Sequence, residues 1–215
     1  MILTYKHGRG NKVHLSIDGE YVISTTDKVW YESGYANNSE ISSEEWEDFC
    51  EKINFEKMYE RALDLLDLRD HSEREILDKL TQKFGYDKRE QAKYVCDKLS
   101  ENGLLDDEHF ARIYATELIN RKHVSTAGLR AALSAKGISR DITSLIIEEM
   151  SPDPYEAIGK IIDSRFASYD LLDENKCDKI ITHLYRKGFL MCDIREVLED
   201  RRREIKIAQL DTPTT

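Results

Sequence analysis

A leucine followed closely by a glycine recurs three times along the chain at a nearly constant interval. The three copies end at Gly85, Gly137 and Gly188, so successive glycines lie 52 and 51 residues apart. Glycine tolerates the left-handed backbone conformation that ends many helices, and apolar residues at helical spacing precede each copy. A period of roughly 50 residues indicates a repeat architecture, in which each unit buries apolar surface against its neighbours.

Each copy is predicted to be a unit of three helices. The first helices begin near Phe55, Asp107 and Pro154, and the second helix of each unit ends at the glycine. Asp153 before Pro154 is typical of a helix cap followed by a first-turn proline. The third helices are predicted at 88–100, 140–150 and 193–207. We therefore expect an all-α protein of tandem three-helix repeats that form an elongated, curved array.

The first forty residues follow a different pattern. Apolar and polar residues alternate over 13–17, and Asp18 and Gly19 supply a turn signal, after which an apolar run resumes. This pattern predicts a small N-terminal β-hairpin extension at 11–32, with 29–31 as a third strand or a docking surface. A hairpin alone is marginally stable in water, so this one is expected to pack on another part of the chain.

From Ser42 onward the pattern is helical throughout. Ser42 and Glu45 have the spacing of a capping box, and Ser72 and Glu75 repeat it. Separate helices are predicted at 42–53 and 55–68. The predicted organisation is an N-terminal extension at 1–41, a linker helix with the first repeat at 42–105, the second repeat at 106–150, the third repeat at 151–207 and a disordered tail at 208–215.

Two adjacent aspartates, a glutamate and a histidine at 106–109 raise the question of a metal or acid–base site. No HExxH or CxxC motif completes a ligand set, and His109 has no recognisable nucleophile or acid partner in the sequence. The four cysteines lie far apart, without zinc-ligand or disulfide spacing. No phosphate-binding loop is present either. We expect no metal, no cofactor and no enzymatic activity.

The same stretch has an architectural interpretation. Gly103 is a helix stop, and Asp106 is placed to cap the next helix, whose first turn favours the negative charge of Asp107. Leu105 and Phe110 have the spacing of a hydrophobic staple across that helix start. Caps use these residue types routinely, so this interpretation is preferred to a catalytic one.

Charge is unevenly distributed along the chain. The net charge of −10 argues against a protein whose main role is to wrap nucleic acid. Residues 42–70 hold ten acidic against four basic residues, whereas 109–140 hold six basic residues. The candidates for contact with phosphate or with an acidic partner are Arg112, Arg121, Lys122, Arg130, Lys136, Arg140, Arg186 and Lys187. A solvated helical face explains them equally well.

Three aromatic residues near the repeat glycines, Tyr86, Tyr185 and Phe189, are assigned to core packing, with base stacking as the minority alternative. No apolar run approaches the roughly 20 residues of a membrane span, and the N-terminus lacks the apolar stretch of a signal peptide. We expect a soluble cytoplasmic protein with no membrane partner, and a monomer.

Three motifs resemble the RecX family, bacterial modulators of the recombinase RecA. GLLDDEHFA, from Gly103 to Ala111, is similar to the family's Gly-Tyr/Leu-Leu-Asp-Asp-x-x-Phe-Ala signature. LRDHSEREILDKL resembles its arginine, serine and glutamate pattern, and LYRKGF resembles its Arg-Gly-Phe. The matching residues of these two motifs are Arg69, Ser72, Glu75 and Leu80, and then Lys187, Gly188 and Phe189. The resemblance covers about 55–207.

The resemblance implies a function. Family members bind the RecA nucleoprotein filament, lie along its groove and usually inhibit ATP hydrolysis and strand exchange, within DNA repair, recombination and the SOS response. Arg69 joins the candidate contacts on this ground. The chain departs from the family in the middle helix of the second repeat, where a glycine, a basic pair and a glutamate are common but this chain has Ser125, Ala127, Gly128 and Ala132. It also departs at Lys187, which replaces arginine. These departures lower the expected contribution of direct DNA contact.

Two functions therefore follow from the sequence. The first is binding and inhibition of the RecA filament, with a weak direct contact to DNA left open. On that hypothesis, charge reversal at Arg121, Lys122 and Arg130 weakens inhibition without unfolding the chain. The alternative is a DNA-binding helical adaptor that acts without RecA, for which a steep salt dependence of DNA binding is expected.

Overall fold

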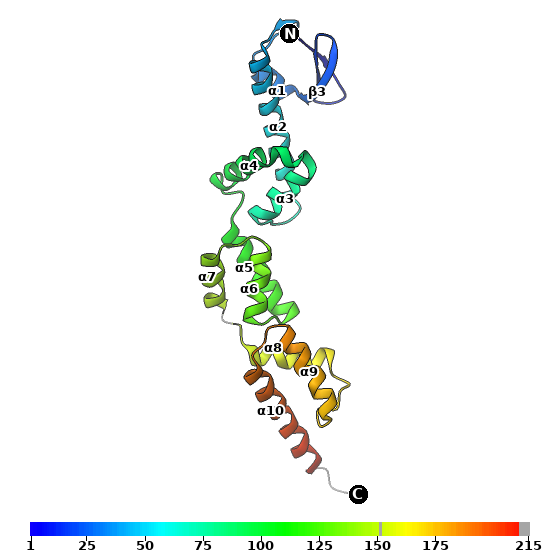
Figure 1. Ribbon diagram of the computed structural model, residues 1–215, viewed down its shortest axis with the longest axis vertical. Coiled ribbons are helices and arrows are strands. Elements are labelled where there is room, and N and C mark those ends of the chain that lie inside the picture. The colour runs from blue at the N-terminus through cyan, green and yellow to red at the C-terminus, as the bar shows by residue number, and fades with distance from the viewer. Residues whose placement is uncertain (151, 211–215) are drawn as a thin grey trace. The chain divides into compact units, whose positions relative to one another are not determined.

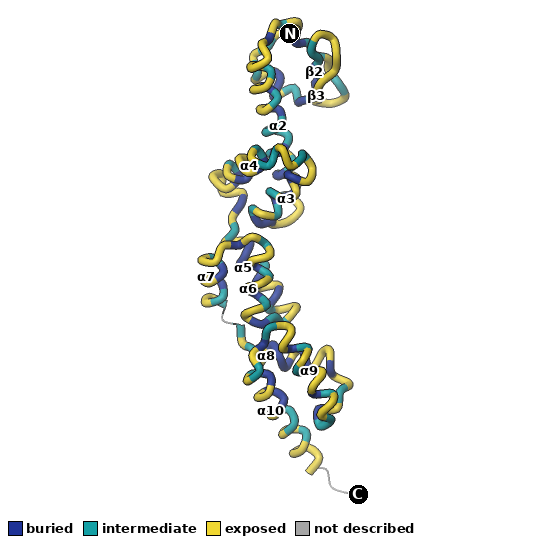
Figure 2. Tube along the Cα trace, in the orientation of Figure 1, coloured by how far each residue is buried: buried dark blue, intermediate teal, exposed yellow. Residues whose placement is uncertain are grey.

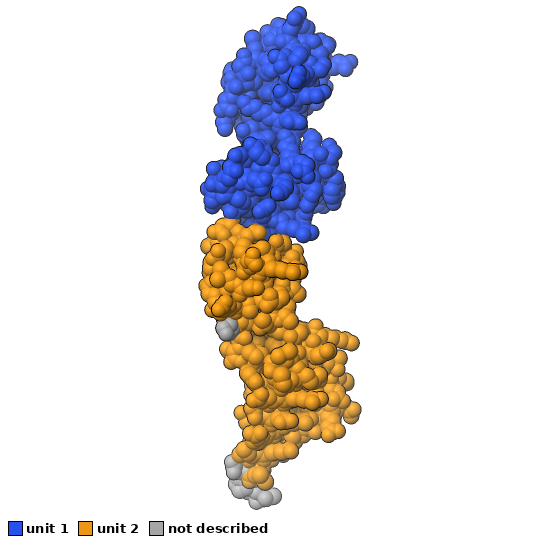
Figure 3. All heavy atoms as spheres, turned by 60° about the vertical axis from the view of Figure 1, so that its left-hand side comes forward, with its two compact units in different colours: residues 1–105 blue, residues 106–215 orange. Residues whose placement is uncertain are grey.

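The chain forms two compact units, 1–105 and 106–215 (Figure 3). The computed structural model describes residues 1–150 and 152–210. The first unit holds a sheet and a helical part, and the second unit is helical (Figure 1). Tandem three-helix repeats with a small N-terminal β element are therefore confirmed. The elongation and curvature of the array stay predictions.

The N-terminal element is a four-stranded antiparallel sheet in the order β3-β2-β1-β4. The predicted hairpin is confirmed, because β2 and β3 pair around Asp18 and Gly19, whose φ values are 50° and 88°. The sequence analysis missed two strands, one that precedes the hairpin and a short one that follows it. The strands are β1 (Ile2–His7), β2 (Lys12–Ile17), β3 (Glu20–Thr26) and β4 (Ser39–Glu40).

Of the two alternatives for 29–31, the third strand is wrong, whereas a segment that docks against the sheet is confirmed. These residues lie in the short helix α1 (Asp27–Glu32), because the Thr26 side chain accepts a hydrogen bond from the amide of Val29 and caps a helix there. Val29 and Trp30 are buried with Leu3 and Leu15 of the sheet. The segment therefore packs beneath the sheet instead of extending it.

The prediction of two helices between 42 and 68 is also wrong, because one helix, α2 (Ser43–Leu66), runs through this region. The capping box of Ser42 and Glu45 is confirmed at its start. No proline or glycine interrupts it. Its first half supplies Phe49 and Ile53 to the core under the sheet, and its second half supplies Met58 to the core of the first repeat. One helix thus serves two cores.

The first repeat is completed by α3 (Glu73–Phe84), the short 3-10 turn η1 (Tyr86–Lys88) and α4 (Arg89–Glu101). Ser72 caps α3 by accepting a hydrogen bond from the amide of Glu75. The core of this repeat is apolar and includes Met58, Ala62, Ile76, Leu80, Val95 and Leu99.

The second unit contains the second and third repeats, each around its own core. The second repeat consists of α5 (Asp107–Glu117), the π-helical turn η2 (Leu118–Lys122), α6 (Thr126–Ala135) and α7 (Arg140–Met150). The third consists of α8 (Pro154–Arg165), α9 (Glu174–Arg186) and α10 (Met191–Leu210). Figure 2 shows α10 buried near its start and exposed toward its end. Residues 208–210, assigned to a disordered tail, are helical, and 211–215 lie outside the described residues.

The recurring leucine and glycine have one structural explanation in the second and third repeats. The amide of Ile138 donates to the carbonyl oxygen of Leu133 at 3.1 Å, and the amide of Phe189 donates to that of Leu184 at 3.2 Å. Both are the wide hydrogen bond of a Schellman motif, and the glycines between have φ values of 83° and 85°. The apolar residue after each glycine is thereby turned back onto its own core.

Candidate functional site

The junction between the two units is built from a helix stop and a helix cap. Gly103 has φ of 68°, and the amides of Leu104 and Leu105 both donate to the carbonyl oxygen of Leu99, at 2.9 and 3.3 Å. Asp106 then caps α5, because one of its carboxylate oxygens accepts from the amides of Glu108 and His109, each at 2.9 Å. The carboxylate satisfies free amides of the first turn.

The flanking side chains of the junction enter different cores. Leu105 is buried in the core of the first repeat, whereas Phe110 and Ala111 are buried in that of the second. Asp107 lies in the first turn of α5, next to the positive end of the helix dipole. The staple between Leu105 and Phe110 stays a prediction.

Removing the Asp106 carboxylate should lower stability modestly. Asp106→Ala leaves two amides of the first turn without their acceptor, and loss of such a cap costs about 1 kcal/mol of unfolding free energy. Urea unfolding followed by circular dichroism measures this loss. Asp106→Asn keeps an acceptor oxygen and should lose less. Equal stability of Asp106→Ala and the unmodified chain would contradict the assigned cap.

The described ranges 1–150 and 152–210 hold no group of three or more histidine, cysteine, aspartate or glutamate side chains arranged to bind a metal ion. His109 is exposed beside the Asp106 cap. No helix in the part of the chain that the structure describes has the length and apolar character needed to cross a membrane.

Several of the candidate cations are held by acids of the same chain. Arg69 forms a bidentate contact with Glu75, at 3.1 and 3.2 Å. Arg112 of α5 reaches Glu149 of α7 at 3.0 Å and Glu108 at 2.8 Å. Hydrogen bonds to Glu149 and then Glu108 raise the pKa of Arg112, and the same contact lowers the pKa of Glu149. Arg112 therefore links α5 to α7, and Arg69 links the segment before α3 to α3 itself.

Two further candidates also have partners within the chain. The Arg121 guanidinium lies 3.3 Å from the Glu117 carboxylate, one turn earlier, and is largely exposed. The ammonium of Lys136 lies 5.4 Å from the ring centroid of Tyr114, within the range of a cation–π interaction. Charge reversal at either position would therefore change intramolecular contacts as well as any binding.

The remaining candidates differ from these. Within 1–150 and 152–210, no ion pair or side-chain hydrogen bond involves five exposed cations of the second unit. They are Lys122, Arg130, Arg140, Arg186 and Lys187. An exposed cation without an internal partner is free to meet phosphate or an acidic protein surface. The candidate cations therefore fall into two groups. The first group is held by partners within the chain, and the second, called the available cations below, consists of the five that have no such partner in the described residues.

A close contact joins the second repeat to the third at Lys187, one of the five available cations. The hydroxyl of Ser125 donates to the carbonyl oxygen of Lys187 at 2.7 Å. A β-carbon at Gly188 would lie 3.0 Å from the Ala127 β-carbon, and one at Gly128 would lie 3.3 Å from the Lys187 carbonyl oxygen. Sequence reasoning missed this contact, although the cluster of small residues after Val124 was a signal for it.

The assignment of Tyr86 and Tyr185 to core packing is wrong, whereas Phe189 is buried as expected. Tyr86 is 82% exposed and Tyr185 62% exposed, against 2% for Phe189. Tyr86 differs from its counterparts because the leucine and Gly85 are one residue further apart, and Gly85 adopts an extended ψ of 151° that leads into η1. Tyr185, next to Arg186 and Lys187, is an exposed aromatic residue beside two available cations.

The fold and these surfaces define a tandem three-helix-repeat protein with an N-terminal sheet. The family model described as the first three-helix domain of RecX matches residues 59–99, which form most of the first repeat. The regulatory protein RecX of Chlorobium phaeobacteroides is 31% identical over 150 residues, which cover 66% of this chain and 92% of that protein. The chain belongs to the RecX family of regulatory proteins.

Longer similarities agree with this membership. The regulatory protein RecX of Clostridium tetani is 27% identical over 191 residues, which cover 87% of both chains. A crystal structure of a regulatory protein RecX matches with a TM-score of 0.67 and 20% identity, over 93% of this chain and 98% of that chain. The structure of RecX from Lactobacillus salivarius matches over 68% of this chain, with a TM-score of 0.55. The solved structures share the fold.

Proposed function

We propose that this protein binds the RecA nucleoprotein filament and inhibits its ATP hydrolysis and strand exchange, without catalysis of its own. Membership of the RecX family carries the proposal, since the chain covers 92% of a relative to which it is 31% identical. A monomer that acts in the bacterial cytoplasm fits this role. The function rests on recognition, so the surface matters more than any single pocket.

The repeat architecture supports binding to a polymer. Each repeat has its own core, so each presents a separate surface at a regular interval along the chain. A filament offers the same surface at every protomer. Contacts that are individually modest then combine through the high effective concentration of linked modules.

The five available cations, Lys122, Arg130, Arg140, Arg186 and Lys187, support a charged component of that binding. Their chain carries a net charge of −10, so general attraction to phosphate is absent and any anionic contact must be local. Acidic patches on the recombinase and phosphates of its bound DNA are both suitable partners for this group.

Co-sedimentation with RecA filaments tests the proposal. Filaments assembled on single-stranded DNA are pelleted with the chain, and the rate of DNA-dependent ATP hydrolysis is measured in parallel. We expect the chain to pellet with the filaments and to slow hydrolysis in a dose-dependent manner. DNA without RecA, pelleted under the same conditions, is the control. Absence of the chain from the RecA pellet would refute the proposal.

The second candidate function is a DNA-binding helical adaptor that acts without RecA. The position of exposed Tyr185 beside Arg186 and Lys187 favours it, because aromatic rings and cations together bind single strands. A salt titration with single-stranded and duplex DNA discriminates between the two functions. Tight binding in the absence of RecA with a steep salt slope would favour the adaptor.

A further inference from the structure

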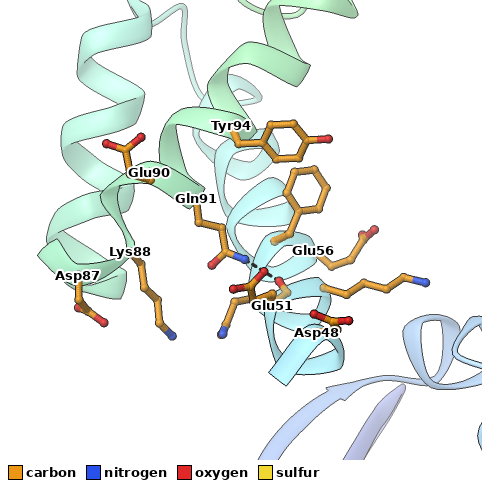
Figure 4. A pocket seen from close by; sticks show the side chains of 11 residues that line it. Asp48, Glu51, Glu56, Asp87, Lys88, Glu90, Gln91 and Tyr94 are labelled. Carbon is orange, nitrogen blue, oxygen red and sulfur yellow. Dashed lines mark hydrogen bonds between the residues drawn. The ribbon is translucent and has the colours of Figure 1, made fainter. Parts of the chain in front are cut away.

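A groove of about 770 Å³ lies on the first unit, between α2 and the η1–α4 segment (Figure 4). Its volume is in the usual range of binding clefts. Five carboxylates line it, against the two ammonium groups of Lys52 and Lys88. They belong to Asp48, Glu51, Glu56, Asp87 and Glu90. The groove is therefore negatively charged, in contrast to the available cations of the second unit.

These carboxylates differ from the acidic side chains that form ion pairs with arginines within the fold. Glu75, Glu117 and Glu149 each hold an arginine. Across the part of the chain that the structure describes, none of the five groove carboxylates forms a side-chain hydrogen bond or an ion pair. Five carboxylates beside only two ammonium groups repel one another, and a positively charged ligand would relieve this repulsion.

An aromatic wall stands beside the carboxylates. The ring centroids of Phe55 and Tyr94 lie 5.4 Å apart, and Tyr94 is 52% exposed. The ammonium of Lys98 already lies 5.5 Å from the Tyr94 ring centroid, so this ring interacts with a cation within the chain itself. Such rings attract cations through their π faces and also cover the alkyl stem of a lysine or arginine.

A hydrogen bond links the two walls of the groove, α2 and α4. The side-chain amide of Gln91 in α4 donates to the backbone carbonyl oxygen of Glu51 in α2 at 2.6 Å, as the dashed line in Figure 4 shows. Behind them, α2 and α4 share the core of the first repeat, in which Met58 and Val95 are fully buried. The groove is consequently formed before any ligand arrives, which reduces the cost of binding.

We propose that this groove binds a basic segment of a protein partner, with lysine or arginine side chains against Phe55 and Tyr94 and their charges among the carboxylates. From Asp48 to Glu56 the helix rises by about 12 Å, which exceeds one side chain and suits several. Lys52, Lys88 and Asn54 supply donors for the backbone carbonyls of a peptide. Phosphate is repelled, so nucleic acid is not the ligand.

The partner's identity rests on the proposed function. If the chain binds the RecA filament, the basic segment belongs to the recombinase protein and not to its DNA. The first unit would then contact protein, whereas the available cations of the second unit would meet acidic surfaces or phosphate. Opposite charge preferences at two places would fix the direction in which the chain binds a polar filament.

Peptide binding tests the groove without the recombinase. A fluorescent glycine-flanked pentaarginine peptide is titrated with the full chain, and anisotropy gives the affinity. Glu51→Gln together with Glu56→Gln should weaken binding roughly tenfold, since two charge contacts are lost. The matched control is Glu47→Gln with Glu148→Gln, two exposed acids outside the groove that give the same change in net charge. It should stay within about twofold of the unmodified chain.

Equal weakening in the groove variant and the control would overturn the proposal, because it would show only attraction to net charge. Tyr94→Ala tests the aromatic wall and should weaken binding about threefold, and an unchanged affinity would contradict the stacking. Spermidine that displaces the peptide at equal concentration would show that the groove takes any polycation, which refutes the peptide assignment. Circular dichroism checks that each variant folds.

The same variants are then co-sedimented with RecA filaments. Loss of pelleting in the groove variant alone supports the recombinase as the partner. If the unmodified chain does not pellet, the proposed function fails while the peptide result still decides the groove. If it pellets and the groove variant pellets equally well, the recombinase is not the partner of the groove.

Discussion

Gly188→Ala should lower the unfolding free energy of the second unit by about 2 to 5 kcal/mol. Two costs add at this position. The backbone φ is +85°, a left-handed conformation that costs a residue with a β-carbon about 1 to 2 kcal/mol. The new β-carbon would also lie 3.0 Å from both the Ala127 β-carbon and the Ser125 hydroxyl oxygen, and such overpacking costs about 1 to 3 kcal/mol.

Gly103→Ala is the matched control for this prediction. Gly103 has a similar φ of +68°, but no atom lies within 4 Å of the place where its β-carbon would be. Its substitution should therefore cost the backbone term alone, about 1 to 2 kcal/mol. Urea unfolding of both variants, followed by circular dichroism, measures the difference. Equal losses of unfolding free energy would show that the contact between the second and third repeats accommodates the new β-carbon without a loss of stability.

Reversing three available cations should weaken filament binding more than tenfold. The variant combines Lys122→Glu, Arg130→Glu and Lys187→Glu, which changes the net charge from −10 to −16. None of these side chains has an internal ion pair in the described residues, so the fold should be retained. The loss of three attractions and the gain of three repulsions justify roughly tenfold or more. Co-sedimentation and the inhibition of ATP hydrolysis measure the effect.

The control for this variant carries the same change in net charge elsewhere. Lys79→Glu, Lys93→Glu and Lys179→Glu reverse three exposed lysines that are not candidates. Equal weakening by both triple variants would mean that overall repulsion dominates and that the cations are not a binding surface. Arg121, part of the original hypothesis, is omitted because its contact with Glu117 would confuse loss of binding with loss of structure.

The elements that sequence reasoning predicted correctly are those with local causes. The Ser42 capping box and the turn at Gly19 are determined within a few residues, so they can be recognised without knowledge of the fold. The repeat was recognisable because Leu133 and Leu184 lie four residues before their glycines, the spacing of a Schellman motif. The first copy is one residue longer, which explains why Tyr86 was misassigned.

The elements that sequence reasoning missed depend on distant residues. β1 pairs with β2 and β4, and β4 pairs with β1, so both strands depend on residues outside their own segment, and their own residues carry a weak signal. One partner of Arg112 is Glu149, 37 residues away, and the hydroxyl of Ser125 donates to a carbonyl oxygen 62 residues away. Which cations are available and where the repeats join could therefore not be read from spacing alone.

The sharing of α2 between two cores has a consequence for how the protein opens. Phe49 and Ile53 belong to the core under the sheet, and Met58, one turn further on, belongs to the core of the first repeat. Melting of the sheet would expose the apolar side of the first half of α2, and fraying of that half would spread into the second. We expect amide hydrogens of the sheet and of the first repeat to exchange with solvent as one cooperative unit, so the N-terminal sheet is a structural part of the first repeat and not a detachable appendage.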